Sequence, residues 1–255
     1  MFSKKIDTST SDYDTATDYY NKNNFKKSIY FYKRHLKNHQ KDANAYYYLG
    51  LAYVCFNRLD LAIIAFQKTI EIQPDNPNAY YNLGNCYFNS KKYIEAITKY
   101  KKVIELQPDS SDVYYNIALS YTHLRKHQES IPYYKKAIET QPNKVETYYN
   151  IACSYIHLEM FESAISQLKK CIEIEPNHIN ARYNLSCICQ DFKEYEKAIF
   201  EYKKVLEINK MHIYAKYNLE HICSLDENKK LESENDELEE ENPILNSLKS
   251  VIENN

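Results

Sequence analysis

Asparagine recurs at one position of a 34-residue period in this chain. Its side chain offers one acceptor and two donors, which match the polar groups of an extended peptide backbone without reading the peptide's side chains. Five asparagines keep this register: Asn82, Asn116, Asn150, Asn184 and Asn218. A tyrosine precedes each of them, as Tyr81, Tyr115 and Tyr149 do for the central three. We predict that these residues, with the nearby amide of Asn85, bind a peptide.

No other group of residues has the types and spacing that catalysis or metal binding needs. The seven cysteines include no CxxC pair, and Cys187 and Cys189 would point away from each other on a helix. The eight histidines show no metal-ligand spacing, and the chain has no glycine-rich phosphate loop. We therefore expect the cysteines to be small apolar residues at helix interfaces, and the protein to be a non-enzyme without a cofactor or metal.

The elements that must position the asparagines are helices, as residues 77–110 illustrate. A first apolar face keeps the spacing i, i+3, i+4 and i+7 with Tyr80, Leu83, Gly84 and Tyr87. A second face contains Ala96, Tyr100, Val103 and Ile104. The polar stretch from Asn89 to Lys92 separates the two faces, and Pro108 ends the second because it lacks a backbone donor. The stretch therefore predicts a helix, a turn and a second helix.

The same pattern of small and large residues occurs along most of the chain. The small residue of the first helix recurs as Ala16, Gly50, Gly84, Ala118, Ala152 and Ser186. The large residue of the second helix recurs as Tyr32, Phe66, Tyr100, Tyr134, Leu168 and Tyr202. We expect the small residues to let two helices approach closely, and the large ones to fill the gap against the neighbouring helix pair.

This period and these positions resemble the tetratricopeptide repeat (TPR) family over residues 9–212. The resemblance implies an all-α fold, a right-handed superhelical α-solenoid of stacked antiparallel helix pairs. The related pentatricopeptide class, which reads RNA, fits less well on the period, the closing prolines and the net charge of −2. We accordingly expect a protein or peptide partner, and no nucleic acid.

The predicted domain organisation follows from the repeat register. It comprises a flexible N-terminus (1–8), six repeats (9–42, 43–76, 77–110, 111–144, 145–178 and 179–212), a capping helix (213–225), an acidic linker (226–242) and a short amphipathic helix or disordered tail (243–255). Two departures stand out. Pro132 falls inside a predicted second helix, where we expect a kink or a late start, and Arg182 and Cys189 replace tyrosines in the last repeat.

The last 30 residues differ sharply in charge from the rest. Ten acids and three lysines give residues 226–255 a net charge of −7, so the preceding residues carry +5 of the total of −2. Beyond the acidic linker, Ile244, Leu245, Leu248, Val251 and Ile252 lie along one helical face. Two interpretations stay open: the paired lysines of the second helices form a solvated outer ridge, as is common in this family, or the acidic tail folds back over the repeats.

The groove positions indicate which kind of TPR site to expect. The asparagines resemble the ladder in the TPR arm of O-linked N-acetylglucosamine transferases, which holds peptide backbone. They do not resemble co-chaperone TPRs that bind acidic chain termini, because those carry lysine at two repeat positions, and here one of these is always tyrosine while the other is Asn44, Asn78, Asp112, Glu146 or Asn180. Asparagine is also frequent at this position in TPRs, so the residues can equally reflect family composition, and the tyrosines can pack between repeats.

Two functions follow from the resemblance, together with a less favoured third. The chain is either an adaptor that binds an extended or helical partner segment in its groove, or a structural subunit that contacts a larger assembly through the stack ends or outer face. In the third, it is the recognition arm of a separately encoded enzyme, or a co-chaperone. No apolar run reaches membrane-spanning length, and residues 1–15 lack the apolar core of a signal peptide, so we expect a cytoplasmic or nuclear location.

Overall fold

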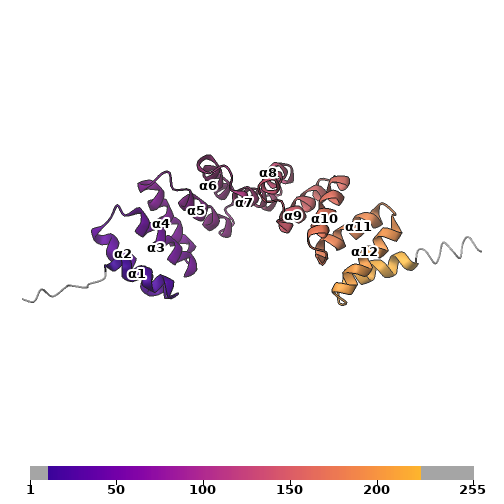
Figure 1. Cartoon of the computed structure of the whole chain (residues 1–255), viewed down its shortest axis with the longest axis horizontal. Helices are drawn as coiled ribbons and strands as arrows, with labels where there is room; N and C mark the ends of the chain where they lie inside the picture. Colours follow the sequence, from indigo (N-terminus) through magenta and orange to yellow (C-terminus); the bar gives the residue numbers. More distant parts are fainter. Residues whose placement is uncertain (1–10, 225–255) are drawn as a thin grey trace, which may run out of the picture. The chain divides into compact units, whose positions relative to one another are not determined.

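The computed structural model describes residues 11–224, and helices are the regular secondary structure throughout this range (Figure 1). The chain divides into two compact units, one ending at Glu159 and the other beginning at Met160. The first contains α1 (Asp12–Asn21), α2 (Phe25–Asn38), α3 (Ala43–Cys55), α4 (Leu59–Ile72), α5 (Pro77–Asn89), α6 (Tyr93–Leu106), α7 (Ser111–His123), α8 (His127–Thr140) and α9 (Val145–His157). The second contains α10 (Phe161–Ile174), α11 (Ile179–Asp191), α12 (Tyr195–Ile208) and a last helical segment at 213–224.

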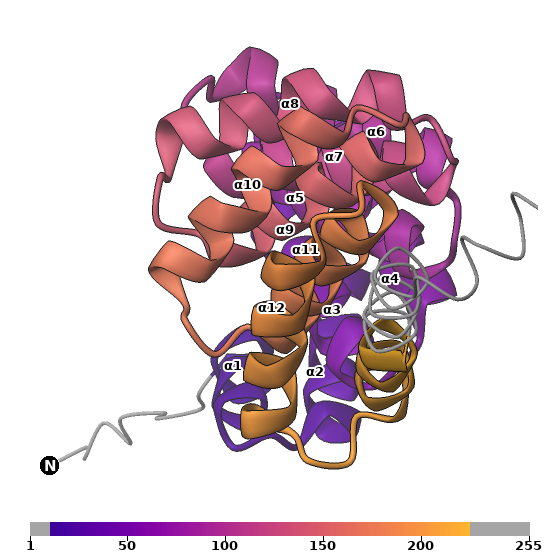
Figure 2. The same cartoon turned by 90° about the vertical axis from the view of Figure 1, so that its right-hand side faces the viewer.

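Within each unit, every helix packs against the helix that follows it. In the first unit α1 to α8 form four antiparallel pairs, and α9 packs on α8. In the second unit α10 packs on α11, and α11 pairs with α12; Figure 2 shows segment 213–224 running beside α12. The fold is the predicted all-α solenoid of stacked helix pairs. The predicted N-terminal segment 1–8, acidic linker 226–242 and C-terminal segment 243–255 lie outside the described residues.

The turn inside each pair contains a residue in the left-handed conformation. Six non-glycine residues adopt φ between 55° and 60°, and they keep the 34-residue register: Asn23, Asn57, Lys91, Arg125, Glu159 and Lys193. In the third pair the amide of Lys91 donates to the carbonyl of Phe88 at 2.9 Å, and that of Lys92 to the carbonyl of Tyr87 at 2.9 Å. A left-handed conformation costs a residue with a Cβ about 1 kcal/mol or more, and packing and these hydrogen bonds offset that cost.

The core shows which residues fill the space inside a helix pair. Tyr100 of α6 lies directly over Gly84 of α5, because a Cβ built on Gly84 would come within 2.6 Å of the Tyr100 ring. Phe66 lies over Gly50 in the same way, at 2.7 Å. The large residues therefore pack on the small residue of their own pair, whereas the sequence interpretation assigned them to the gap against the neighbouring pair.

Pro132 does not delay the start of its helix, so of the two expected outcomes, a kink or a late start, the late start was wrong. Helix α8 begins at His127, in the same register as α6 and α10, and continues through Pro132 to Thr140. The amide of Ser130 still donates to the carbonyl of Lys126 at 3.1 Å, and its hydroxyl donates to the carbonyl of His127 at 2.8 Å. The first turn therefore forms before the proline, and packing of the buried Ile131 and Tyr134 holds the rest.

The N-cap of α3 gives a first testable prediction. The Asp42 carboxylate accepts hydrogen bonds from the Ala45 amide at 3.0 Å and the His35 ring at 2.8 Å. Burial opposes ionisation, but these hydrogen bonds outweigh it and hold the pKa of Asp42 below its ordinary value of 3.8. Since the folded pKa is lowered, this carboxylate stabilises the fold above pH 3.8, and that contribution is lost as the pH falls through the folded pKa.

We expect Asp42→Ala to lower the free energy of unfolding at neutral pH by about 1 kcal/mol, the typical effect of a lost cap. Urea unfolding of both proteins at several pH values measures the difference, which should shrink in acid. Asp75→Ala removes an exposed acid as the control. A difference that stays constant down to the lowest accessible pH would contradict this role for the carboxylate.

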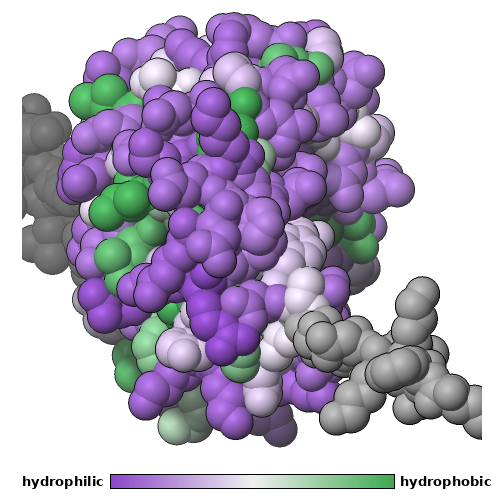
Figure 3. Space-filling model, turned by 90° about the vertical axis from the view of Figure 1, so that its left-hand side faces the viewer, coloured by the Kyte–Doolittle hydropathy of each residue, from purple (hydrophilic) through white to green (hydrophobic). Residues whose placement is uncertain are grey.

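The surface is predominantly polar in the view of Figure 3, where hydrophobic residues form small separate groups. Among residues 11–224, none of the helices combines the length and apolar character needed to cross a membrane.

Candidate functional site

The predicted asparagines of the first unit are hydrogen-bonded to tyrosines of the preceding repeat. Each Nδ2 atom donates to the hydroxyl of the tyrosine 35 residues earlier, across neighbouring first helices. The three bonds are Asn82 to Tyr47 (3.1 Å), Asn116 to Tyr81 (3.4 Å) and Asn150 to Tyr115 (2.8 Å). We call these six residues the Asn–Tyr row. It connects α3, α5, α7 and α9 in succession and so runs along the face of the first helices.

These bonds fix the orientation of each side-chain amide. Asn82 uses its second N–H as well, donating to the carbonyl of Asn78 at 2.9 Å. Asn82 thus uses both of its side-chain N–H groups, and Asn116 and Asn150 use one each, while Oδ1 of all three accepts no hydrogen bond from the described residues. Burial raises the pKa of Tyr47, and the bond from Asn82 partly offsets that effect, so the hydroxyl stays neutral. The row thus presents one acceptor in each repeat and one further N–H at Asn116 and Asn150, and these groups suit the N–H and C=O groups of an extended peptide.

The remaining predicted residues have other surroundings. The Oδ1 atom of Asn85 accepts a hydrogen bond from the hydroxyl of the buried Tyr100 at 2.7 Å, so its carbonyl stabilises a helix pair. Asn218 donates to the hydroxyl of Tyr202 at 2.9 Å, on the second helix of the preceding pair. Asn184 on α11 has the repeat position of the row's asparagines, and Tyr149 on α9 has that of its tyrosines. Both are half-buried, and they belong to different compact units. The structure therefore brings the row together in the first unit.

Sequence reasoning missed a charged group beside the row. Lys144, the residue before α9, forms an ion pair with Asp112 of α7 at 2.7 Å and lies 4.3 Å from the ring centre of Tyr115. Nothing in the sequence indicated that a lysine 32 residues after Asp112 would reach its carboxylate. Because the pair cancels its own charge, this part of the face does not select for an acidic or a basic partner.

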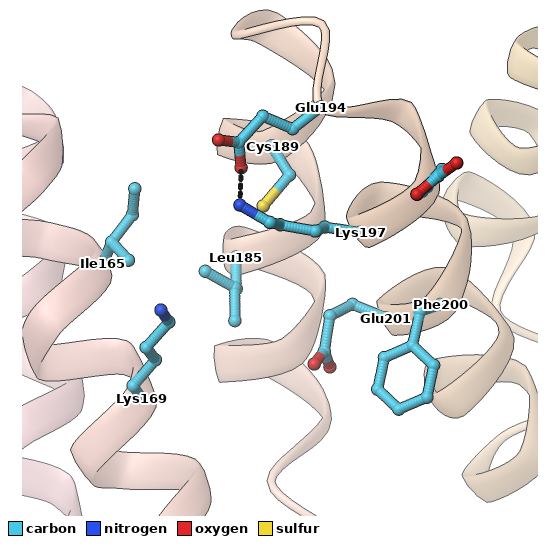
Figure 4. A pocket seen from close by; sticks show the side chains of 9 residues that line it. Ile165, Lys169, Leu185, Cys189, Glu194, Lys197, Phe200 and Glu201 are labelled. Atoms are coloured by element: carbon cyan, nitrogen blue, oxygen red, sulfur yellow. Dashed lines mark hydrogen bonds and ion pairs between the residues drawn. The ribbon is translucent and has the colours of Figure 1, made fainter.

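A second site that the sequence did not reveal is a pocket of about 300 Å³ in the second unit (Figure 4). Its lining comes from three helices, α10, α11 and α12. The apolar part consists of Ile165, Leu185, Cys189 and the Phe200 side chain, and charged residues at its edges include Lys169 and Lys197. A pocket of this size with mainly apolar walls accommodates one large side chain of a partner.

An equivalent pocket of about 290 Å³ lies in the first unit, between α2, α3 and α4. The two pockets correspond through a shift of four repeats, because Lys33, Leu49 and Tyr53 stand where Lys169, Leu185 and Cys189 stand in the second. The geometry is therefore a property of the repeat. The residue types differ, since Tyr46 and Ala65, which are uncharged in the first-unit pocket, correspond to the charged Arg182 and Glu201 in the second unit.

Arg182 and Glu201 form an ion pair that is largely shielded from solvent. The Arg182 Nη1 and Glu201 Oε2 atoms are 2.5 Å apart, and the side chains are 12% and 14% exposed. Arg182 also donates from Nε to the carbonyl of Pro176 at 2.7 Å. Burial, with the nearby carboxylate of Glu194, raises the pKa of the Cys189 thiol, so this cysteine is protonated and a poor nucleophile.

The other cysteines and histidines form no metal or redox centre within residues 11–224. All seven cysteines are free thiols, and the described residues contain no cluster of three or more metal-ligating side chains. The rings of His127 and His157 stack at 4.3 Å, and burial lowers the pKa of His127. These residues act as packing groups.

The sequence matches family models of the tetratricopeptide repeat over most of the described region. Residues 77–110 and 111–144 match one model described as tetratricopeptide repeat, and 145–178 and 179–210 match another. A third model, described as TPR repeat, matches residues 57–91. Among curated proteins, no sequence matches the chain.

Solved structures with the same fold include several TPR proteins. A crystal structure described as YrrB, a TPR protein with an unusual peptide-binding site, is 24% identical, with a TM-score of 0.65, over 73% of this chain and 96% of that one. A crystal structure of MamA is 26% identical, with a TM-score of 0.63, over 65% of this chain and 91% of that one. Residues 41 to the end of MamA from Desulfovibrio magneticus RS-1 are 18% identical, with a TM-score of 0.63, over 67% and 96%.

Proposed function

The chain belongs to the tetratricopeptide repeat family of protein–protein interaction modules, and we propose that it is a non-catalytic adaptor that binds an extended partner segment along the Asn–Tyr row. Helical repeats of this kind use the extended surface formed by successive repeats to bind partners. The observation that carries the proposal is the regular array of oriented amides in the first unit, at Asn82, Asn116 and Asn150.

The geometry favours recognition of peptide backbone over side chains. Each asparagine is held by a tyrosine hydroxyl, so its Oδ1 atom has a fixed position before a peptide arrives, and little side-chain entropy is lost on binding. The acceptors repeat once per helix pair, which suits a ligand that continues along several repeats. Since the Asp112–Lys144 pair neutralises itself, a strongly charged ligand has no advantage at this place.

We expect replacement of any one of Asn82, Asn116 and Asn150 by alanine to weaken peptide binding severalfold, because each hydrogen bond contributes on the order of 1 kcal/mol. Peptides selected from a displayed random library on the full chain serve as probes, and isothermal titration calorimetry measures their affinity for each variant. Unchanged affinity in a variant with an intact circular dichroism spectrum would count against the row as the binding site.

The matched control replaces two exposed asparagines away from the row, Asn89 and Asn143, with alanine, and it should bind the same peptides normally. A second variant, Tyr81→Phe, removes only the hydroxyl to which Asn116 donates. We expect Tyr81→Phe to weaken peptide binding less than Asn116→Ala does, because the Oδ1 acceptor of Asn116 is still present but is no longer held in one orientation.

The two pockets favour a second candidate function, that of a structural subunit in a larger assembly. The pocket of the second unit is lined by α10, α11 and α12, and the equivalent pocket of the first unit by α2, α3 and α4. A subunit role predicts that Phe200→Asp and Ile64→Asp abolish assembly while the selected peptides still bind. An adaptor role predicts the opposite: partner binding depends on the asparagines of the row and not on these two pocket residues.

A further inference from the structure

The C-terminal end of the described region has an uncovered apolar surface. Three side chains of segment 213–224 are strongly exposed, namely Ile213 (76%), Tyr214 (70%) and Tyr217 (68%), and the neighbouring Met211 is 83% exposed. Ile213 and Tyr217 lie on the side of the segment away from its buried residues, Ala215 and Ile222, and Tyr214 lies on its flank. We call these four residues the end face.

Comparison with the preceding repeat shows what the end face lacks. Tyr183 occupies the position of Tyr217 one repeat earlier, and it is half-buried because its ring contacts Tyr202 at 6.0 Å and His212, at the start of the next repeat, at 4.9 Å. Tyr217 has no following repeat among the described residues. The end face is therefore a surface on which a further helix would pack.

The residues that follow directly cannot supply the second helix of a seventh repeat. The buried positions Ala198, Tyr202 and Val205 of α12 correspond, 34 residues later, to Glu232, Asp236 and Glu239. Three acids at core positions would each be buried without a partner, which costs several kcal/mol. The acidic linker therefore does not continue the array in register.

Residues 243–253 have the pattern that the end face requires. The apolar side chains there follow the helical spacing, and Asn242 and Pro243 provide the start signals of a helix. The apolar residues are Ile244, Leu245, Leu248, Val251 and Ile252. A helix of this length is only marginally stable in water by itself, so its apolar face needs another surface to pack on.

Length and charge both favour docking within the same chain. The 18 residues 225–242 reach about 60 Å when fully extended, and as a flexible coil they span about 20–25 Å. Segment 213–224 is about 18 Å long, so the linker easily returns to its start. Tethering of this kind gives a local concentration in the mM range. The hollow beside Met211 and Tyr217 is lined by Lys210, Lys216 and Glu220, of which Lys216 and Glu220 are paired at 3.9 Å, so its net charge of +1 attracts the nine acids of residues 226–242.

We propose that residues 243–253 dock their apolar face on the end face of the same chain, with the acidic linker held near Lys210 and Lys216. The docked segment replaces the missing helix of a seventh repeat and closes the C-terminal end of the array. This proposal is independent of peptide binding at the Asn–Tyr row.

The test uses the full chain, which contains no tryptophan. Tyr217→Trp places the chain's single tryptophan on the end face, where acrylamide quenching of its emission, excited selectively over the tyrosines, reports its exposure. We expect weak quenching and a blue-shifted emission. Adding Leu248→Asp and Val251→Asp to the apolar side of the tail should raise the quenching constant severalfold and shift the emission to the red.

Two controls separate docking from other effects. Asn246→Asp with Ser250→Asp adds the same charge on the opposite side of the tail helix and should keep the tryptophan protected. Tyr30→Trp, at a residue 60% exposed on α2, should be quenched equally with every tail. Equal quenching of Tyr217→Trp with all three tails would overturn the proposal. Protection that disappears on dilution would overturn it too, because a second copy of the chain would then cover the end face.

Discussion

Replacing Arg182 by methionine is expected to lower the free energy of unfolding by about 3 kcal/mol, the lower end of the cost of breaking a buried ion pair. The Glu201 carboxylate is 14% exposed, and without Arg182 it would lose its cationic partner at 2.5 Å. Methionine keeps most of the side-chain volume, so the loss reports the uncompensated charge and not a cavity. Urea unfolding followed by circular dichroism measures the effect, and hydrogen exchange should localise it to α11 and α12.

The matched control comes from the chain itself. Arg182→Tyr combined with Glu201→Ala installs the residues that the second repeat has at the same positions, Tyr46 and Ala65. Replacing a buried ion pair by apolar groups is often neutral, so we expect this double variant to lie within about 1 kcal/mol of the natural protein. A double variant that is as unstable as Arg182→Met would show that the ion pair is not the cause.

The second large effect is expected at Gly84. Its Cα lies so close to the ring of Tyr100 that an added Cβ would be 2.6 Å away, and Tyr100 is fully buried. We expect Gly84→Leu to destabilise the protein by about 3 kcal/mol, because the overpacked ring must move and drive α5 and α6 apart. Gly84→Ala should lower the free energy of unfolding by less, because alanine stabilises a helix by about 1 kcal/mol relative to glycine.

Thermal and urea unfolding of both variants check this expectation, with Asn89→Leu at the exposed end of α5 as the control. The fourth pair, α7 and α8, shows why the effect is specific to its place. Ala118 and Tyr134 are both fully buried there, so a helix pair that formed around an alanine accommodates its Cβ. Gly84→Leu with stability close to that of the natural protein would mean that α5 and α6 can separate at little cost.

The repeat architecture was predictable from the sequence because its signals are local. Small residues, aromatic residues and closing prolines recur every 34 residues, and residues three and four apart define the faces of each helix. These patterns gave the helix pairs and the turns between them, as α5 and α6 illustrate. They also identified the row of asparagines as a candidate site, since register alone places one amide in each repeat.

Tertiary structure decided what those residues contact. Asn116 donates to a tyrosine 35 residues earlier, and Arg182, which the sequence indicated only as a departure from the repeat, pairs with a glutamate 19 residues later. Such partners depend on how neighbouring helices stack, which periodicity does not contain. The same reason explains the start of α8 at His127 despite Pro132, and the left-handed Lys91 without a glycine: packing on both sides outweighed the local preference.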